Sequence, residues 1–272
     1  MEFYLQMEAD MILDEIAEKT RLRVERAKQE IPPETMKQRA EQMKSTSGQA
    51  AFPFEEELRR PGISFICEVK KASPSKGLIA EDFDYRKIAR EYEAAGAGAI
   101  SVLTEPDYFL GDIRYLKEIS EEVSVPLLRK DFVVDEYMIY EAKVNGASLA
   151  LLICALLDED TLRRYIGICD SLGLSALVEA HDGQEIQKAV RAGARVIGVN
   201  NRNLKDFTVD IRNGLRLREQ VPEEILFVAE SGIKTRQDII ELEKGKVNAV
   251  LIGETLMRSD DKKAMLDELK GV

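Results

Sequence analysis

Eight short apolar runs, which start roughly 20 to 35 residues apart, constrain the fold of this 272-residue chain more than any other feature. The runs are rich in β-branched residues, and each stretch between them is long enough for one helix and two loops. Near-continuous apolar strands separated by helices are typical of a parallel sheet that is covered on both faces. The runs span residues 64–70, 99–105, 125–131, 149–155, 175–181, 195–201, 225–231 and 248–254.

The number of these units favours a closed sheet. Eight strand–helix units predict a (β/α)8 barrel. The alternative is an open, doubly wound sheet, which usually has a glycine-rich phosphate loop after its first strand. Residues 71–77 (Lys-Ala-Ser-Pro-Ser-Lys-Gly) follow the first run here, and they do not form such a loop. We therefore predict an α/β fold of the TIM-barrel type.

The first 60 residues have a different pattern. Apolar residues recur at helical spacing from Ile12 and Ile16 onward, until Pro32 and Pro33 interrupt the pattern, and a polar helical stretch follows. We expect two short helices there, as an extension rather than a second domain. The whole chain, 1–272, would then be a single barrel domain with residues 1–60 as its N-terminal helical extension.

Composition excludes several classes of function. The chain has 39 Lys and Arg against 50 Asp and Glu, and a net charge of −11 disfavours binding along nucleic acid. A single histidine, His181, excludes sites that need two, and the three cysteines lack metal-ligand spacing. No apolar run reaches transmembrane length, and residues 1–10 lack the pattern of a signal peptide. We expect a cytoplasmic protein with reduced thiols and no metal, membrane or nucleic-acid partner.

Charged residues gather where the runs end, which is where a barrel places its active site. If Phe65 and Cys67 face the helices, strand alternation points Glu68 and Lys70 into the barrel mouth. The same alternation pairs Lys130 with Leu128 and Glu179 with Leu177, whereas His181 falls one place past it and is expected in a loop. Partly desolvated carboxylates and ammonium groups have shifted pKa values that suit general acids and bases. The alternative is a purely structural network of ion pairs.

The last two runs predict a phosphate site. Ser231-Gly232 and Gly253-Glu254 follow them, and glycine lets backbone N–H groups approach an anion closely. The loops after the seventh and eighth strands are the recurrent phosphate site of barrels. Residues 235–238 (Thr-Arg-Gln-Asp) add the signature of a helix start.

Taken together, seven segments resemble the indole-3-glycerol-phosphate synthase family. They are 68–78, 101–105, 128–132 (Leu-Arg-Lys-Asp-Phe), 177–181 (Leu-Val-Glu-Ala-His), 198–204, 229–233 and 252–257. The likeness runs in order from about Ile12 to Leu256. It implies a barrel with the helical extension packed over its mouth. It also implies a carboxy-lyase of tryptophan biosynthesis that uses neither cofactor nor metal. The substrate would be 1-(2-carboxyphenylamino)-1-deoxyribulose 5-phosphate, converted to indole-3-glycerol phosphate, carbon dioxide and water.

The resemblance also implies roles for individual residues. Lys130 resembles the general acid of ring closure, and Lys70 the second lysine, which holds anionic groups and serves dehydration. Glu179 is similar to the carboxylate that stabilises the cationic intermediate, Glu68 to the partner of Lys70, and which glutamate is the dehydration base stays open. The remaining catalytic residues would be Asn200, Glu230 and Ser231. Substrate and phosphate would be bound by Ser73, Arg202, Gly232, Gly253 and Glu254. Apolar walls are expected from Phe109, Phe132, Leu151, Ile153, Leu177, Leu204 and Ile252.

Two other functions are compatible with the fold. One is another phosphate-binding barrel, such as phosphoribosylanthranilate isomerase, whose usual barrel is shorter and pairs a first-strand cysteine with an aspartate. Cys67 lies on the first strand, but it alternates with Glu68 and should face outward. The other is a non-catalytic barrel that binds a phosphorylated metabolite, although binding alone does not need two pairs of lysine and glutamate. We expect a small phosphorylated substrate and a monomer that at most self-associates weakly.

Overall fold

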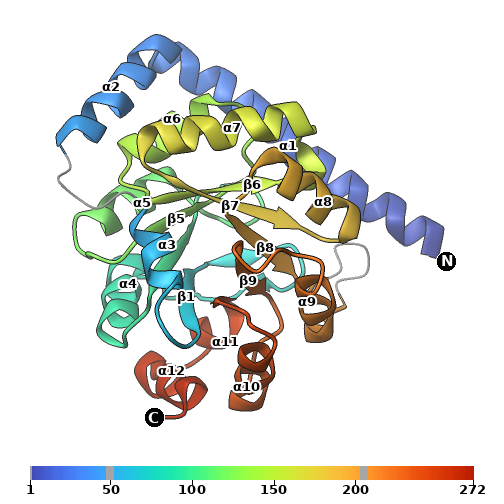
Figure 1. Ribbon diagram of the computed structural model, residues 1–272. Helices are drawn as coiled ribbons and strands as arrows, with labels where there is room; N and C mark the ends of the chain where they lie inside the picture. Colours follow the sequence, from blue (N-terminus) through green and yellow to red (C-terminus); the bar gives the residue numbers. More distant parts are fainter. Residues whose placement is uncertain (1, 47–51, 203–207) are drawn as a thin grey trace.

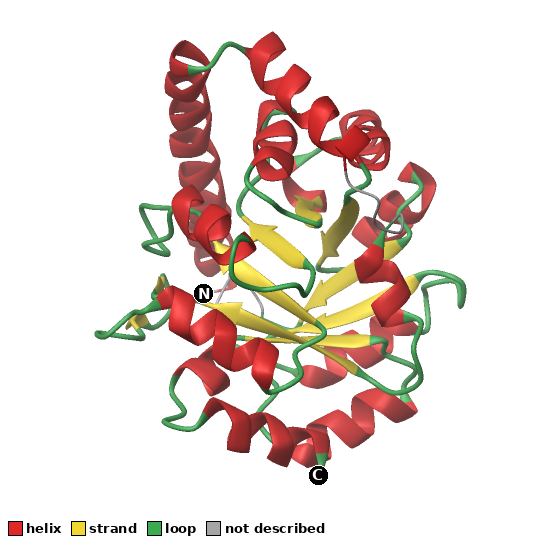
Figure 2. Cartoon of the chain, turned by 90° about the vertical axis from the view of Figure 1, so that its left-hand side faces the viewer, coloured by secondary structure: helices red, strands yellow, loops and turns green. Residues whose placement is uncertain are grey.

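In the computed structural model, which describes residues 2–46, 52–202 and 208–272, the eight apolar runs form eight parallel strands of one closed barrel. Strands that follow one another along the chain are neighbours, and β1 pairs with both β4 and β10 to close the ring. Figure 2 shows these strands enclosed by helices. The strands are β1 (Ser64–Val69), β4 (Ala99–Leu103), β5 (Leu127–Lys130), β6 (Leu149–Ile153), β7 (Ser175–Ala180), β8 (Val196–Asn200), β9 (Leu226–Glu230) and β10 (Ala249–Ile252). The predicted barrel is confirmed.

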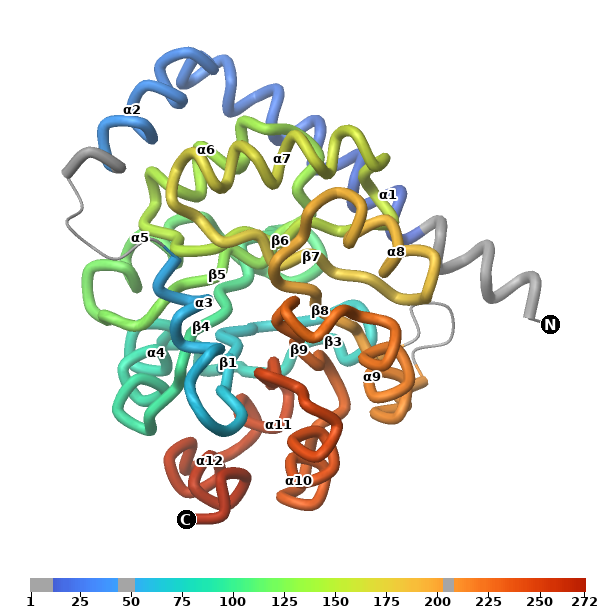
Figure 3. The backbone as a smooth tube through the Cα atoms, in the orientation of Figure 1, coloured from blue at the N-terminus to red at the C-terminus, as the bar shows by residue number. Residues whose placement is uncertain are grey.

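Helices follow every strand and surround the sheet, as the tube in Figure 3 traces from β1 round to the C-terminus. Aspartates cap most of them, and α10 begins with the predicted capping box, in which Thr235 and Asp238 exchange hydrogen bonds. The helices are α4 (Tyr85–Ala94), α5 (Ile113–Ser120), α6 (Tyr137–Val144), η1 (Cys154–Leu156), α7 (Glu159–Leu172), α8 (Gly183–Ala192), α9 (Ile211–Arg218), α10 (Arg236–Lys244), α11 (Glu254–Met257) and α12 (Lys262–Lys270). A short hairpin, β2 (Ala72–Ser73) with β3 (Gly77–Leu78), follows β1.

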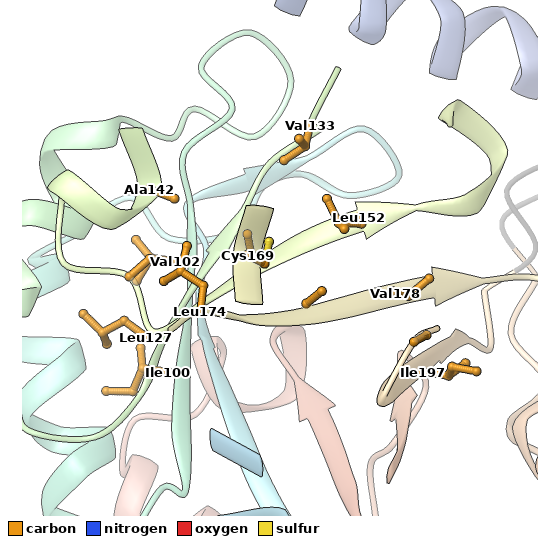
Figure 4. Packing of buried hydrophobic residues seen from close by; sticks show 14 of the residues in the cluster. Ile100, Val102, Leu127, Val133, Ala142, Leu152, Cys169, Leu174, Val178 and Ile197 are labelled. Atoms are coloured by element: carbon orange, nitrogen blue, oxygen red, sulfur yellow. The ribbon is translucent and has the colours of Figure 1, made fainter. Parts of the chain in front are cut away.

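Strand alternation divides the core into two layers. Phe65 and Cys67 belong to the outer layer between strands and helices, whereas Ile66 belongs to the barrel interior. Figure 4 shows part of the outer layer, with Ile100, Val102, Leu127, Leu152, Val178 and Ile197 on the strands. The interior contains Leu128, Leu151, Leu177, Val228 and Leu251. The predicted orientation of the strands is therefore correct.

The N-terminal extension differs from the two short helices that we expected. It contains α1 (Glu2–Glu30), α2 (Pro33–Thr46) and a third helix, α3 (Pro53–Leu58). The first helix is 29 residues long, and it meets α2 at an angle at the top of Figure 1. The second helix packs against α6. None of the described helices is long and apolar enough to cross a membrane.

Helix α3 closes the end of the barrel where the strands begin. Phe54 and Leu58 pack into the interior cluster, and the carboxylate of Glu55 accepts a hydrogen bond from Ser175 at the start of β7. Arg195, just before β8, binds Glu55 and Asp170 together, with Nη2–oxygen distances of 2.8 Å to each. The opposite end, where the strands finish, stays open to a cavity.

Candidate active site

One cavity of about 1000 Å³ lies at the carboxyl ends of the strands. All twelve polar and glycine positions that we predicted for the site line this cavity. They are Glu68, Lys70, Ser73, Lys130, Glu179, Asn200, Arg202, Glu230, Ser231, Gly232, Gly253 and Glu254. Five of them occupy the last inward-facing place of a barrel strand, namely Glu68, Lys130, Glu179, Asn200 and Glu230. The others lie in the segments that follow the strands.

Lys130 is at the centre of the charged residues. Its ammonium lies 2.8 Å from Oε2 of Glu179 and 3.3 Å from Oε2 of Glu230. These three residues come from β5, β7 and β9, so their side chains converge from alternate strands, as in one layer of a barrel interior. All three side chains are largely shielded from water.

Lys130, Glu179 and Glu230 form a triad whose charges depend on one another. Burial by itself lowers the pKa of Lys130, but the carboxylates of Glu179 and Glu230 outweigh it and hold that pKa above its usual value. Burial raises the pKa of Glu179, but Lys130 and His181 outweigh it and keep that carboxylate ionised well below its usual range. At neutral pH Lys130 is therefore an ammonium with a proton to donate, and Glu179 is its counter-ion.

The pKa of Glu230 is shifted in the opposite direction to that of Glu179. Burial raises its pKa to about 7, with Glu179 and Glu68 adding to the effect and Lys130 opposing it. Its Oε1 atom is buried and has no hydrogen-bond partner within the described part of the chain. Gly198 leaves room for this carboxylate, because a Cβ there would overlap Oε1. Glu230 is thus the one carboxyl group of the triad that titrates near neutral pH.

A second ion pair, between Glu68 and Lys70, lies beside the triad. Both residues extend from β1, and Oε2 of Glu68 accepts a hydrogen bond from Ser101 on β4 at 3.5 Å. Gly253 faces this pair, and a Cβ there would overlap Glu68 and lie 2.9 Å from the ammonium of Lys70. Gly253 therefore makes space for the ion pair, which is a reason for glycine besides the phosphate contact that we predicted.

The turn after β9 has an unusual backbone. Ser231 has φ +67° and Gly232 has φ +84°, so two successive residues adopt the left-handed conformation that side chains disfavour. Asn201 holds this turn, since its amide donates to the carbonyl of Ser231 at 3.2 Å and its Oδ1 accepts from Gly214 at 2.9 Å. We predicted Asn200 but not Asn201, although the two are adjacent in the sequence.

Cations gather at the side of the cavity next to this turn. Arg202 lines it beside Asn200, whose Oδ1 accepts the backbone N–H of Arg202 at 3.0 Å. The carboxylate of Glu254 lies 3.5 Å from Lys76 and 3.2 Å from Arg258. Burial raises the pKa of Glu254, but these two cations outweigh it and lower that pKa overall. The negative charge of Glu254 is therefore neutralised, so it does not oppose an anion.

The apolar walls agree with the prediction in part. Phe109, Phe132, Leu151, Ile153 and Ile252 line the cavity, and the rings of Phe109 and Phe132 lie 6.0 Å apart. Leu177 does not line the cavity, because it is fully buried in the barrel interior below. Leu204 lies outside the described residues. Further apolar lining that we did not predict includes Ile12, Leu13 and Ile16 of α1.

Helix α1 is fixed to the strand that carries Lys130. Arg23 binds Oδ1 of Asp131 at 2.7 Å, and the side chain of Asp131 is fully buried. Arg129 binds the other oxygen of Asp131 at 3.3 Å and also Glu141 at 2.7 Å. The sequence did not indicate this network, because its members are far apart along the chain and each is an ordinary charged residue.

His181 is a further residue that sequence reasoning missed. It follows β7 in a loop, as expected, but its ring turns back and lies 3.3 Å from Oε1 of Glu179. Cys67, by contrast, is buried in the outer layer, where burial raises its pKa to about 12. Among the described residues, no group of three or more histidines, cysteines, aspartates or glutamates is placed to hold a metal ion.

Comparison with known proteins identifies relatives of this chain. The family model described as "Indole-3-glycerol phosphate synthase" matches residues 13–269. A curated protein of that name from Ruminiclostridium cellulolyticum is 58% identical over 261 residues, covering 96% of this chain and 99% of the relative. Another, from Lachnoclostridium phytofermentans, is 51% identical over 270 residues, covering 96% of this chain and all of the relative.

Solved structures match the fold at much lower identity. A 3-hexulose-6-phosphate synthase is similar with a TM-score of 0.64 and 13% sequence identity, covering 77% of this chain and 99% of that chain. At this level the likeness supports the barrel architecture and carries no statement about activity.

Proposed function

The chain belongs to the indole-3-glycerol phosphate synthase family, and we propose that the residues lining the barrel mouth catalyse this reaction in the roles given below. The enzyme is a carboxy-lyase of tryptophan biosynthesis. It converts 1-(2-carboxyphenylamino)-1-deoxyribulose 5-phosphate to indole-3-glycerol phosphate, carbon dioxide and water. The single observation that carries the assignment of roles is Lys130, a buried ammonium between two carboxylates at the mouth.

Lys130 is the general acid of ring closure. The ring carbon that bears the carboxylate attacks the ribulose carbonyl, a carbon–carbon bond forms, and negative charge develops on the carbonyl oxygen. That alkoxide is far more basic than the starting carbonyl, so it takes a proton even from an ammonium whose pKa is raised. The positive charge of Lys130 also stabilises the oxygen before the proton moves.

Glu179 stabilises the positive charge that ring closure leaves on the anilino nitrogen. Its pKa is depressed, so it is an anion throughout the neutral range. Loss of carbon dioxide then returns the electron pair of the breaking carbon–carbon bond to this iminium. Because the intermediate contains its own electron sink, this step needs an anion nearby but no further acceptor.

Dehydration needs an acid for the departing hydroxyl group and a base for the ring proton. Lys70 lies directly after β1, with Glu68 of that strand as its counter-ion, and it is the acid that we assign to this step. Of the carboxylates that line the mouth, Glu68, Glu179 and Glu230 lie beside the two lysines and are the candidates for the base. Asn200 and Ser231 complete the ring of hydrogen-bonding groups around the substrate.

The substrate phosphate binds between the turns at Gly232 and Gly253. Arg202, Ser73 and Glu254 line the same cavity, and the carboxylate of Glu254 is bound by cations, which leaves its backbone N–H for the phosphate. The aromatic ring of the substrate packs against Phe109, Phe132, Leu151, Ile153 and Ile252. We further propose that the extension and the barrel act as one domain, and that the protein is a cytoplasmic monomer.

The isomerase alternative would need the first-strand cysteine at the mouth. Cys67 instead faces the helices, and its raised pKa makes the thiolate scarce. A non-catalytic barrel would bind the substrate but form no indole, so measurement of turnover separates that alternative from ours.

Turnover of Lys130→Ala tests the general-acid assignment. The chain has no tryptophan, so indole fluorescence from the product appears against a protein background of tyrosine alone. We expect the wild type to form product and Lys130→Ala to lose about 10² to 10⁴-fold in kcat, the range for a general acid. Lys117→Ala, which removes a surface lysine of α5, is the matched control and should keep full activity. A silent wild type that still binds the substrate would contradict the chemistry, and an active Lys130→Ala would contradict the role of Lys130.

A further inference from the structure

His181 is the only histidine of the chain, and its imidazole lies between two carboxylates. Nε2 is 3.3 Å from Oε1 of Glu179, and Nδ1 is 3.2 Å from Oε2 of Glu185 on α8. The backbone N–H of His181 donates to the same oxygen of Glu185 at 2.7 Å. Glu185 therefore holds both the backbone and the ring of His181, which fixes the direction in which the ring points.

This arrangement gives each oxygen of Glu179 its own cation. Lys130 binds Oε2 at 2.8 Å, and Nε2 of His181 lies 3.3 Å from Oε1 as an ion pair, without a hydrogen-bond partner among the described residues. A carboxylate held at one oxygen can still rotate about its last bond, whereas two contacts fix its plane. Lys130 has to move its proton toward the substrate during ring closure, so a contact independent of Lys130 keeps Glu179 in place at that moment.

The surroundings keep His181 charged. Burial by itself lowers the pKa of the imidazole, but Glu179 and Glu185 outweigh it and raise that pKa to about 10. Beyond Glu179 lie Lys130 of β5 and Glu230 of β9. From α8, Lys188 donates to the carbonyl of Cys154 at 2.7 Å, and Asp182 accepts the N–H groups that begin the helix. The two carboxylates that contact the ring therefore dominate its charge.

We propose that His181 is the positioning residue of Glu179, and that Glu185 in turn orients His181. The imidazolium holds Oε1 of Glu179, so that the other carboxylate oxygen stays in line with Lys130 and the substrate. This inference rests on the proposed function, because it assigns His181 a part in the step that Glu179 serves.

Two replacements of His181 separate positioning from packing. His181→Phe keeps a flat ring but removes both N–H groups, whereas His181→Gln keeps an amide N–H that can reach Glu179. We expect His181→Phe to lower kcat about tenfold with KM within about twofold, because the lost contact acts on the chemical step and not on binding. His181→Gln should restore most of that loss. Lys188→Gln, on the same helix, is the control and should leave kcat unchanged.

The pH profile provides a readout that a packing role would not change. Without the imidazolium, the pKa of Glu179 rises, so the acid limb that Glu179 contributes to the kcat profile, below the titration of Glu230 near pH 7, should move to higher pH in His181→Phe. The single histidine also gives one imidazole C2 proton signal in the NMR spectrum. Its titration midpoint should lie near pH 10 in the wild type and fall toward the ordinary value of 6.5 in Glu185→Gln.

The outcomes distinguish this proposal from the proposed function. An active wild type with an equally active His181→Phe, and an unmoved acid limb, overturns the positioning role and leaves the synthase reaction intact. Loss of kcat in His181→Phe that His181→Gln does not relieve also overturns it, because the N–H contact would then not matter. A wild type that binds the substrate without turnover instead overturns the reaction itself.

Discussion

Among single residues, Glu230 combines the clearest cost to stability with a place in the catalytic set that we propose. Its carboxyl group is buried, one oxygen is 3.3 Å from Lys130, and the other has no partner among the described residues. A buried carboxylate without full hydrogen bonding is costly, and its raised pKa of about 7 records that cost. Gly198 contributes the necessary space, so the backbone of β8 is adapted to a side chain on β9.

Replacement of Glu230 by glutamine should stabilise the protein above neutral pH. The native state retains a proton between pH 4.5 and about 7 that the unfolded chain has already released. Wild-type stability therefore falls as the pH rises through this window, by up to about 3 kcal/mol. Glu230→Gln is neutral at every pH and lacks this slope. Thermal unfolding followed by circular dichroism should show a higher Tm than the wild type at pH 8 and a similar Tm near pH 4.5.

A control for this prediction comes from the surface of the barrel. The hydrogen bonds and charges of Tyr85, Arg86 and Arg114 lower the pKa of Glu118, so Glu118→Gln should give no gain in Tm at pH 8. If Glu230→Gln instead lowers Tm at pH 8, the ion pair with Lys130 outweighs the cost of burial. Glu230 would then be a stabilising residue.

The sequence predicts most of the charged mouth but not the contacts just beyond it. Alternation along a strand fixes the direction of each Cβ, and this placed Glu68, Lys130 and Glu179 correctly. A residue past the last strand position, such as His181 or Asn201, points wherever the following turn directs it. Strand alternation does not predict the conformation of that turn. The contacts of His181 with Glu179 and of Asn201 with Ser231 are therefore evident only from the structure.

Among the elements, α1 is held to the barrel by charged residues as well as by apolar packing. Ile12, Leu13 and Ile16 line the cavity, and about two turns of helix further on, Arg23 fixes the helix to the barrel. The helical spacing of the apolar residues predicts that this segment is a helix. It does not predict where the helix docks, because docking depends on Arg23 and Asp131, which are 108 residues apart.

Removing the contact between Arg23 and Asp131 should weaken substrate binding while the protein stays folded. Arg23→Gln removes one of the two cations on the buried carboxylate of Asp131, while Arg129 and Thr104 still bind it. We expect a loss of about 1 to 3 kcal/mol in unfolding free energy. We also expect a several-fold rise in KM, because the α1 side of the cavity is no longer held in place. Steady-state kinetics and urea unfolding measure the two effects.

Lys28→Gln is the matched comparison on the same helix. Its ion pair with Asp135 is partly exposed to solvent, so its removal should cost less than about 1 kcal/mol and leave KM near the wild-type value. Equal effects of both replacements would show that any tether of α1 suffices and that the buried position of Asp131 has no special role.

Across the whole molecule, the two ends of the barrel differ, because one is an open cavity lined by ion pairs and the other is closed by a helix. The mouth contains the ion pairs of Lys70 and Lys130, whereas the other end is closed by α3 with Phe54 and Leu58. The eight apolar runs were enough to predict the closed barrel, because their number and spacing leave few alternatives. Helix α3 was not predicted, since its six residues are too few to show a helical period.

Replacing a large side chain at the closed end should lower the stability of the protein without changing catalysis. Phe54 is fully buried in the interior cluster, so Phe54→Ala should cost about 3 to 5 kcal/mol of unfolding free energy in urea. The folded fraction of Phe54→Ala should keep the wild-type kcat and KM, because the mouth is at the other end of the strands. Leu22→Ala removes an exposed leucine of α1 and should change stability by less than about 0.5 kcal/mol. A change in KM for Phe54→Ala would show that the two ends are coupled.

The separation of the two ends has a consequence for laboratory evolution. We expect a library selected only for heat resistance to accumulate changes such as Glu230→Gln, which stabilise the protein at the expense of a residue that we assign to the reaction. A library selected for new substrates can vary the apolar walls of the mouth, provided that the packing of α3 at the closed end is first strengthened. Evolvability in this scaffold is therefore set by residues that never meet the substrate.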